Sequence, residues 1–159
     1  MKRLLNKIFP GLLSSRSNPE TVDRDGLTYH QDTNELVTGI VEEFYENGQL
    51  SVRRNYKDGK QDGLFEVFDD TGKLLIRGNY IDGKQEGLGE SFWKDGQLQF
   101  RGNYKDGELD GLDEWFYPNG QLWNRRNYKD GKQDGLREFF DEDGNLTDTR
   151  TFRNGEQVE

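Results

Sequence analysis

The sequence predicts an all-β protein, an open, elongated and twisted antiparallel meander of repeated β-hairpins. The first reason is a 24-residue repeat that runs through five copies without a gap between residues 39 and 158. The second is that each copy holds two glycine-containing turn signals beside runs rich in aromatic and branched residues, as hairpins do. One hairpin cannot bury its apolar face alone, but hairpins stacked side by side can. We therefore expect about eleven or twelve short strands, and no helix after residue 24.

Composition constrains the core. Leu, Ile, Val and Phe make up 37 of the 159 residues, about 23%, and the net charge is −9. Chains below about 20% with a high net charge are usually disordered. The 20 glycines and 20 aromatic residues argue against disorder, because acidic disordered segments are usually poor in aromatics. A stacked repeat accounts for both facts, since neighbouring hairpins share one apolar stripe.

Six positions are identical in all five copies: a leading Gly, a Glu, a Phe, a first turn Gly, a Leu and a second turn Gly. The last copy deviates, with Asp148 and Thr149 where other copies have Val52 and Arg125, as expected of a polar terminal copy. The leading glycines are Gly39, Gly63, Gly87, Gly111 and Gly135; the Glu residues are Glu42, Glu66, Glu90, Glu114 and Glu138; the Phe residues are Phe44, Phe68, Phe92, Phe116 and Phe140.

The first turn of each copy, such as Asn119-Gly120, sets the register of its hairpin. We expect a three-residue loop that ends with the turn Gly in the left-handed region and so forms a bulge. This register gathers the repeated apolar residues on one face, which we expect to be the buried stacking face. In the fourth copy it places four residues on that face and makes Trp115 and Trp123 direct cross-strand partners; the four are Leu112, Phe116, Leu122 and Tyr128.

The chain divides into three parts: a basic N-terminal segment and linker (1–24), a half-repeat cap (25–38) and five tandem hairpin repeats (39–158). Residues 1–24 carry five Lys or Arg and two Asp or Glu, a net charge of +3, so the remainder carries −12. The apolar and basic residues before Pro10 leave three interpretations open: a secretory signal, an amphipathic anchor on a membrane surface, or a frayed terminus or short helix covering the first strands. The stretch 14–20 is expected to be a linker.

The repeats resemble the MORN-repeat variant family, including its YwqK-type antitoxins. The pattern GLxExFxxNGQLxxRxNYKDGKxDG, most complete in residues 111–135, carries this resemblance, which covers about residues 26–158. It implies an elongated open sheet that acts as a binding scaffold. Some bacterial members are similar to immunity proteins or antitoxins, and eukaryotic members have been proposed to contact phospholipids or partner proteins.

Catalytic, metal and cofactor sites find little support in the sequence. The chain has no Cys, and its single His30 cannot form a multi-histidine zinc site. The five repeated Glu residues lie opposite Arg53, Arg77, Arg101 and Arg125, so we expect cross-strand ion pairs rather than an acid–base pair. Calcium binding by Asp58-Gly59 and its equivalents is the less favoured alternative to simple turn geometry. We therefore expect no enzyme activity, no cofactor and no metal.

Large aromatic residues occupy positions at which the copies differ. In the expected register they lie on the face away from the repeated Leu and Phe, where two interpretations stand equal: contact with a partner, or reinforcement of the sheet. The negative charge of Asp110, Asp113 and Glu114 nearby suits a basic partner. The candidate partner-binding residues are Phe65, Trp93, Trp115, Tyr117, Trp123 and Phe139.

These features lead us to expect a non-enzymatic protein-binding scaffold, an antitoxin or immunity-type protein that neutralises a basic toxin domain by direct binding. The alternative is a membrane-associated structural scaffold, held by weak contact of residues 1–13 with a membrane surface. The acidic charge argues against nucleic acid as a partner. Unpaired edge strands would allow a dimer. We expect a cytoplasmic location, with a membrane-associated or exported one as the alternative.

Overall fold

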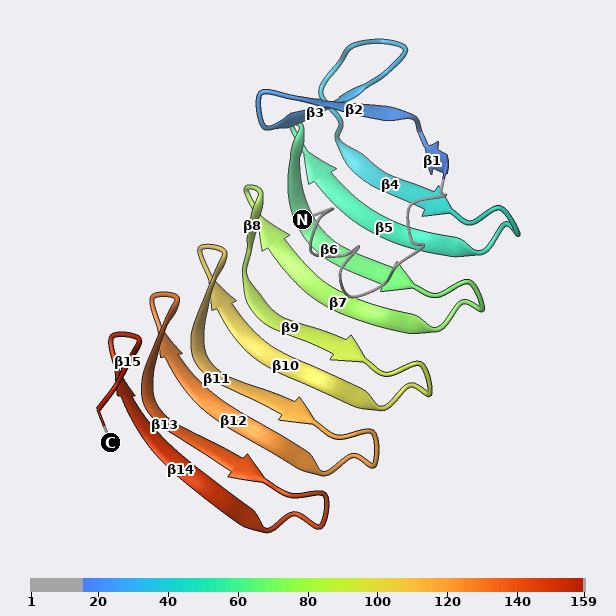
Figure 1. Cartoon of the computed structure of the whole chain (residues 1–159). Coiled ribbons are helices and arrows are strands. Elements are labelled where there is room, and N and C mark those ends of the chain that lie inside the picture. The colour runs from blue at the N-terminus through green and yellow to red at the C-terminus, as the bar shows by residue number, and fades with distance from the viewer. Residues whose placement is uncertain (1–15, 159) are drawn as a thin grey trace.

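The computed structural model describes residues 16–158 and confirms the all-β class (Figure 1). Thirteen strands form one antiparallel sheet in which hairpins follow one another in chain order, and β2 and β3 form a separate hairpin. The strands are β1 (Arg16–Asn18), β2 (Thr21–Arg24), β3 (Leu27–His30), β4 (Gly39–Phe44), β5 (Leu50–Lys57), β6 (Lys60–Phe68), β7 (Leu74–Ile81), β8 (Lys84–Gln85), β9 (Gly87–Phe92), β10 (Leu98–Lys105), β11 (Glu108–Phe116), β12 (Leu122–Lys129), β13 (Lys132–Phe140), β14 (Leu146–Arg153) and β15 (Glu156–Gln157).

The start of the described chain differs from the expected linker. Residues Arg16–Asn18 form β1, which pairs with β4 at one edge of the sheet, so the linker prediction for 14–20 is wrong over these three residues. The expected boundary between residues 24 and 25 falls in the turn of the β2–β3 hairpin, where Arg24 pairs with Leu27. The signal, anchor and terminus interpretations concern residues 1–13, which lie outside the described residues.

The first turn has the expected form. In the fourth copy, the N–H of Gly120 donates to the carbonyl of Tyr117 (2.9 Å), and the N–H of Tyr117 donates to the carbonyl of Gln121 (2.8 Å). Gly120 has φ 84°, in the left-handed region that glycine adopts without steric cost. This is the three-residue loop that the Asn-Gly signal predicts.

A second irregularity directly after this loop makes part of the predicted register wrong. Phe116 pairs with Leu122, but Trp115 pairs with Asn124, so Trp123 is an extra, bulged residue and is not the partner of Trp115. A one-residue insertion moves every later side chain of the strand to the other face. Tyr128 therefore lies on the other face of the sheet from Leu112, Phe116 and Leu122, contrary to prediction. The same shift recurs at this place in every copy.

The sheet thus has two distinct faces. We call the outer face the one that carries the repeated Leu or Ile, Glu, Phe and Arg residues, and the inner face the one that carries Val52, Phe65, Val67, Tyr80 and Trp115. The prediction that the repeated apolar residues form the buried face is wrong. The row on the outer face is exposed, at 39% for Leu64 and 49% for Leu88, whereas Val67 and Phe65 on the inner face expose 0% and 4%.

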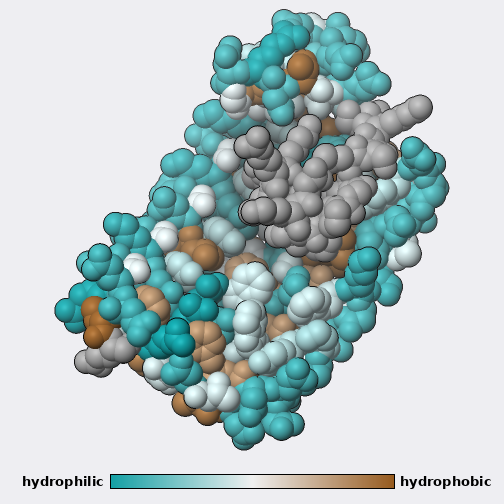
Figure 2. Space-filling view, in the orientation of Figure 1, coloured by the Kyte–Doolittle hydropathy of each residue, from teal (hydrophilic) through white to brown (hydrophobic). Residues whose placement is uncertain are grey.

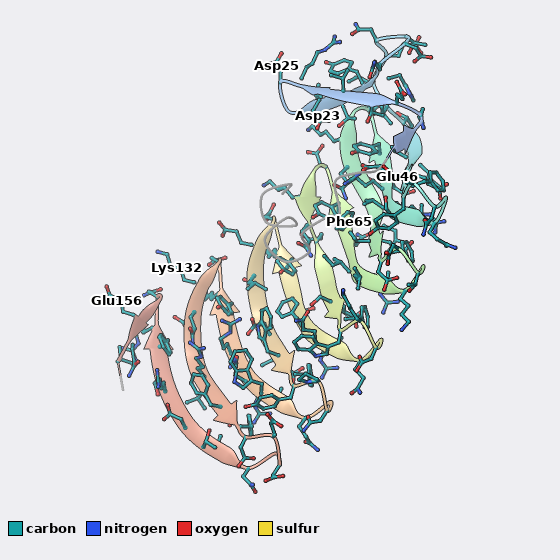
Figure 3. The ribbon with its side chains drawn as sticks, turned by 45° about the vertical axis from the view of Figure 1, so that its right-hand side comes forward. Asp23, Asp25, Glu46, Phe65, Lys132 and Glu156 are labelled. Carbon is teal, nitrogen blue, oxygen red and sulfur yellow. The ribbon has the colours of Figure 1, made fainter. Side chains whose placement is uncertain are left out.

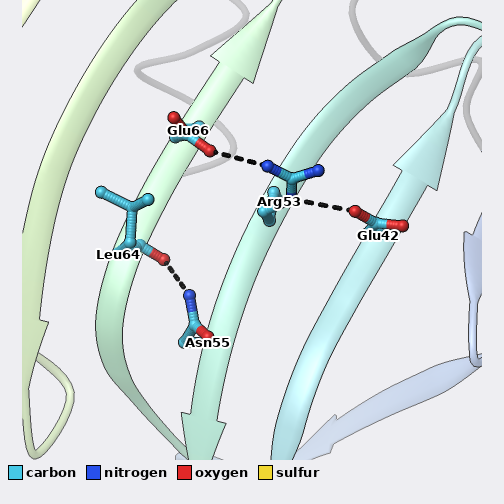
Figure 4. Close-up of polar contacts among 5 residues, drawn as sticks. All are labelled: Glu42, Arg53, Asn55, Leu64 and Glu66. Carbon is cyan, nitrogen blue, oxygen red and sulfur yellow. Dashed lines mark hydrogen bonds and ion pairs between the residues drawn. The ribbon is translucent and has the colours of Figure 1, made fainter.

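Arginine joins neighbouring repeats on the outer face, as the Glu–Arg spacing predicts. Arg53 donates from Nε to Glu42 in its own repeat (2.9 Å) and from Nη1 to Glu66 in the next (3.2 Å), as Figure 4 shows. Beside it, the side-chain amide of Asn55 donates to the carbonyl of Leu64 (2.9 Å). The equivalent inter-repeat ion pairs are Arg77–Glu90, Arg101–Glu114 and Arg125–Glu138.

The core lies on the inner face at the N-terminal half of the sheet. Val52, Phe65, Val67 and Tyr80 form a buried cluster, with the Phe65 and Tyr80 rings edge to face at 5.7 Å. Burial raises the pKa of the Tyr80 hydroxyl. The residues that vary between copies therefore supply most of the buried core as well as the surface around it.

Candidate binding face

The inner face of the C-terminal half combines large aromatic and charged side chains and is the candidate binding face. In the space-filling view, apolar and weakly polar side chains lie along the middle of the face shown, and hydrophilic ones gather along both margins (Figure 2). Of the candidate residues in this half, Trp115 and Phe139 are half-buried, and Trp123 exposes 43% of its surface.

Phe65 is a core residue, which removes it from the candidate set. It exposes only 4% of its surface and packs in the cluster described above (Figure 3). The guanidinium of Arg54, which is itself ion-paired with Glu43, lies 5.8 Å from the centre of the Phe65 ring. A partner would have to displace these contacts to reach Phe65.

Tyr117 links two repeats, and Trp123 packs against it. The hydroxyl of Tyr117 donates to the backbone carbonyl of Phe140 in the next repeat (3.0 Å), as Tyr45 does to Phe68 (2.8 Å) in the first copy. The ring centres of Tyr117 and Trp123 are 6.2 Å apart. Trp123, the most exposed of the six candidate aromatic residues, thus packs against a Tyr117 ring that is fixed by a hydrogen bond to the next repeat.

Trp93 occupies the position of Tyr117 in the third copy but makes no equivalent link. Its indole N–H is buried and has no hydrogen-bond partner among residues 16–158. A buried donor without an acceptor costs free energy. The site therefore holds a polar group whose bonding capacity the described residues leave unused.

Trp115 takes part in a buried polar cluster that was not predicted from the sequence. Asp113 has a fully buried side chain and accepts two hydrogen bonds from Arg126, one of them 2.9 Å from Nε. The indole of Trp115 also donates to Asp113 (3.3 Å), and Arg126 lies 5.9 Å from the Trp115 ring centre. Arg126 is held between the rings of Trp115 and Tyr128, with its charge compensated by Asp113.

The prediction that Asp110, Asp113 and Glu114 present negative charge beside the candidate aromatic residues is wrong for Asp113 and Glu114. Asp113 is buried and paired with Arg126, and Glu114 is paired with Arg101 on the outer face with only 12% of its side chain exposed. Asp110 accepts a backbone hydrogen bond from Asp130 at a turn (3.1 Å). Two of these three carboxylates, Asp113 and Glu114, are therefore neutralised by arginines, and Asp110 is engaged by a backbone N–H at a turn. The signal that could have located the cluster is the third position of each copy, which is charged only in the last two copies, as Asp113 and Arg137.

A cavity of about 840 Å³ lies at the other end of the sheet, between the β2–β3 hairpin and the strands β5 and β6. Thr28, Arg54, Tyr56 and Gln61 are among its lining residues. Burial raises the pKa of the Tyr56 hydroxyl here. The hydroxyl of Thr28 donates to Asp23 (2.8 Å) and Arg54 pairs with Glu43, so these two lining groups are satisfied, whereas the Nε2 of Gln61 is buried without a partner among the described residues.

Chemical reactivity finds no support in the described part of the chain. Residues 16–158 contain no group of three or more His, Cys, Asp or Glu that could hold a metal ion. The same residues contain no helix long and apolar enough to cross a membrane. The paired carboxylates on the outer face lie in one environment, repeated along the sheet, and do not form the differing pair that acid–base chemistry requires.

Comparison with protein-family models decides the family. The model described as the MORN repeat variant matches five times, at residues 37–58, 61–82, 85–106, 109–130 and 133–154. This chain belongs to the MORN-repeat variant family. The matches start 24 residues apart, in agreement with the period in the sequence. The MORN repeat explains the geometry described above: one hairpin a repeat, joined to the next by backbone pairing and by Arg, Tyr and Asn side chains.

Other comparisons add little to the MORN assignment. No curated protein matches this chain. Two crystal structures of TarM, one of them a mutant of the S. aureus protein in complex with Fondaparinux, alpha-GlcNAc-glycerol and UDP, align at 16% identity and a TM-score of 0.41. The alignments cover 83% and 84% of this chain but only 23% of TarM, so this chain spans less than a quarter of that protein.

Proposed function

We propose that this chain is a non-enzymatic protein-binding scaffold of antitoxin or immunity type, which neutralises a toxin by covering it with its inner face. MORN repeats form a repeat protein with a binding role, and this proposal adds the kind of partner and the face. The resemblance to antitoxin-type members supports the kind of partner. The net charge of −9 favours association with a basic domain through electrostatic steering.

The observation that carries the choice of face is the division between repeated and individual residues. The outer face has the same Leu, Glu, Phe and Arg residues in nearly every copy. On the inner face, the residue at the fifth position of the repeat differs in every copy: Glu43, Val67, Ser91, Trp115 and Phe139. A uniform surface offers the same contacts everywhere, but a specific partner needs a surface with unique features. Trp and Tyr are also the residues that most often dominate binding energy at interfaces.

The test is coexpression with the products of adjacent genes. We expect one of them to be toxic alone, to lose toxicity with this chain and to form a complex that survives size-exclusion chromatography. A chain that neither binds nor neutralises any of these products would contradict the antitoxin function. If this chain binds one of these products without neutralising it, the protein-binding function would stand and the immunity function would be ruled out.

The membrane-associated scaffold is kept as the second candidate because residues 1–13 combine apolar and basic residues. Flotation of the full chain with liposomes that contain anionic lipid tests it, with the double variant Leu5→Glu/Ile8→Glu as the control. Flotation of the wild type but not of the variant would support this candidate, and failure of both would remove it.

A further inference from the structure

A row of three arginines crosses the inner face at the C-terminal end of the sheet. Arg126 on β12 lies directly opposite Arg137 on β13, and Arg137 lies directly opposite Arg150 on β14. Like charges in direct cross-strand register are destabilising. The row therefore needs negative charge to be stable.

The two arginines at the ends of this row, Arg126 and Arg150, have carboxylate partners. Arg126 is bound by the buried Asp113, and Arg150 donates to Asp148 on its own strand (2.8 Å). Arg137, in the middle, has no ion pair and no hydrogen bond from its guanidinium to any residue between 16 and 158, and its Nε is buried. Burial first, then the charges of Arg126 and Arg150, lower the pKa of Arg137. Three arginines and two aspartates leave one uncompensated positive charge at Arg137.

Arg137 and Arg150 both lie against the ring of Phe139. The guanidinium of Arg137 lies 4.4 Å from the centre of the Phe139 ring, and Arg150 lies 5.1 Å from the same ring. The Nε2 of Gln133 is also a buried donor without a partner in the described chain, whereas the unpaired Oδ1 of Asn124, opposite Phe139, is an acceptor and does not contribute to carboxylate binding. Gln133 adds a second donor on the strand of Arg137.

We propose that Arg137 is the centre of a carboxylate-binding site, which takes an Asp or Glu side chain from an extended segment of the protein partner. A planar carboxylate matches the fork of donors on a guanidinium, and the single excess charge of the row suits a monoanion better than a phosphate dianion. The aromatic rings of Phe139 and Trp115 supply apolar contact for the rest of a peptide, which a free ion would not use. The site rests on the proposed scaffold function and specifies the chemistry that the partner presents to it.

The site is compatible with a partner that is basic overall. Steering acts through the net charge of the whole chain, whereas the arginine row acts at contact distance, and at physiological salt charges are screened beyond about 8 Å. The partner therefore combines a positive surface with one acidic side chain that reaches Arg137.

The first experiment titrates the full chain with a capped hexaglutamate peptide and follows tryptophan fluorescence, with capped hexaglutamine and inorganic phosphate as separate probes. We expect saturable binding of hexaglutamate alone. The variant Arg137→Gln should weaken this binding at least tenfold, and Arg153→Gln, an exposed arginine with the same change in net charge, should alter it less than twofold. Equal effects of the two variants, or saturation by phosphate but not by hexaglutamate, would overturn the proposal.

Two further measurements, the melting temperature and the binding of the toxic partner, distinguish failure of the carboxylate site from failure of the scaffold function. Arg137→Gln removes a charge from between two like charges, so its melting temperature should equal or exceed that of the wild type. If Arg137→Gln fails to fold, Arg137→Lys is the alternative, because it keeps the charge but lacks the paired N–H donors of the guanidinium. It should weaken hexaglutamate binding at least threefold, and unchanged binding would overturn the proposed site. A toxic partner that binds wild type and Arg137→Gln equally would overturn the carboxylate site and leave the scaffold function standing, whereas selective loss with the variant supports both.

Discussion

Arg125 on β12 is ion-paired with Glu138 on β13, and this pair joins the fourth repeat to the fifth. The second contact of the pair, from Nη2 to Oε1, measures 3.2 Å, and Arg125 lies 5.7 Å from the centre of the Phe140 ring. The fifth repeat ends this series, because Thr149 stands where the other repeats have the arginine. β14 therefore lacks the arginine that forms the inter-repeat ion pair on β5, β7, β10 and β12.

Removal of one of these pairs should cost little. Because Arg125 and Glu138 expose 42% and 20% of their side chains, we expect Glu138→Gln to lower the free energy of unfolding by about 1 kcal/mol or less. A double-mutant cycle with Arg125→Gln, measured by urea unfolding at pH 7, gives the coupling of the pair. A coupling above about 3 kcal/mol would show that the outer face contributes much more than exposed ion pairs do.

The same pair should respond to acid. The hydrogen bond from Arg125, ahead of a smaller opposing effect of burial, lowers the pKa of Glu138 below its usual 4.5. A carboxyl with a lowered pKa in the folded state stabilises the fold above its unfolded pKa, and this contribution is lost as the pH falls through the folded pKa. The coupling energy should therefore be present at pH 7 and decline as the pH falls below the usual pKa of a Glu side chain. A coupling that grows on acidification would contradict this sign.

Breaking the buried pair on the inner face should cost more. Asp113 exposes none of its side chain and Arg126 only 18%, so Asp113→Asn leaves a nearly buried guanidinium without its counter-charge. We expect a loss of about 3 kcal/mol in the free energy of unfolding. The control is Asp82→Asn, which removes an ion pair with Lys60 in which Asp82 exposes 73% and Lys60 44% of its side chain, and should cost much less than Asp113→Asn. Equal losses in the two variants would mean that Asp113 is not the buried partner described.

The hydroxyl of Tyr117 tests the link between repeats. Tyr117→Phe removes the hydrogen bond to the carbonyl of Phe140 and should lower the free energy of unfolding by about 1 kcal/mol, as measured by urea unfolding. Tyr29→Phe removes a hydroxyl that bonds to no residue in the described range 16–158 and should leave stability within about 0.5 kcal/mol of the wild type. A neutral Tyr117→Phe would indicate that backbone pairing alone joins the repeats.

The sequence predicted the family, the hairpin of each repeat and the first turn, because glycine at a left-handed φ leaves a clear signal at Gly120. It did not predict the bulge at Trp123, since an extra residue in a strand has no characteristic residue type: this position is Ser51, Leu75 and Gln99 in other copies. That one residue determines which face Tyr128 occupies. It also determines which face is buried, and so the error passed from the register to the choice of Phe65 as a candidate binding residue.

The arginine row was missed for a related reason. Arg126, Arg137 and Arg150 are 11 and 13 residues apart in the sequence, and only the true register places them side by side. Residue variability alone was enough to select Trp115 and Phe139, whose rings contact this row, as candidate partner-binding residues, but not to show that the row has one uncompensated charge.

A pair of matched variants distinguishes binding of the partner to the inner face from binding to the outer face. Trp123, beside Tyr117, and Leu112, on the outer face of the same repeat, are similarly exposed, at 43% and 40%. Isothermal titration with the neutralised toxin should show that Trp123→Ala raises the dissociation constant at least tenfold, while Leu112→Ala changes it less than twofold. A large effect of Leu112→Ala with a neutral Trp123→Ala would instead place the binding surface on the outer face.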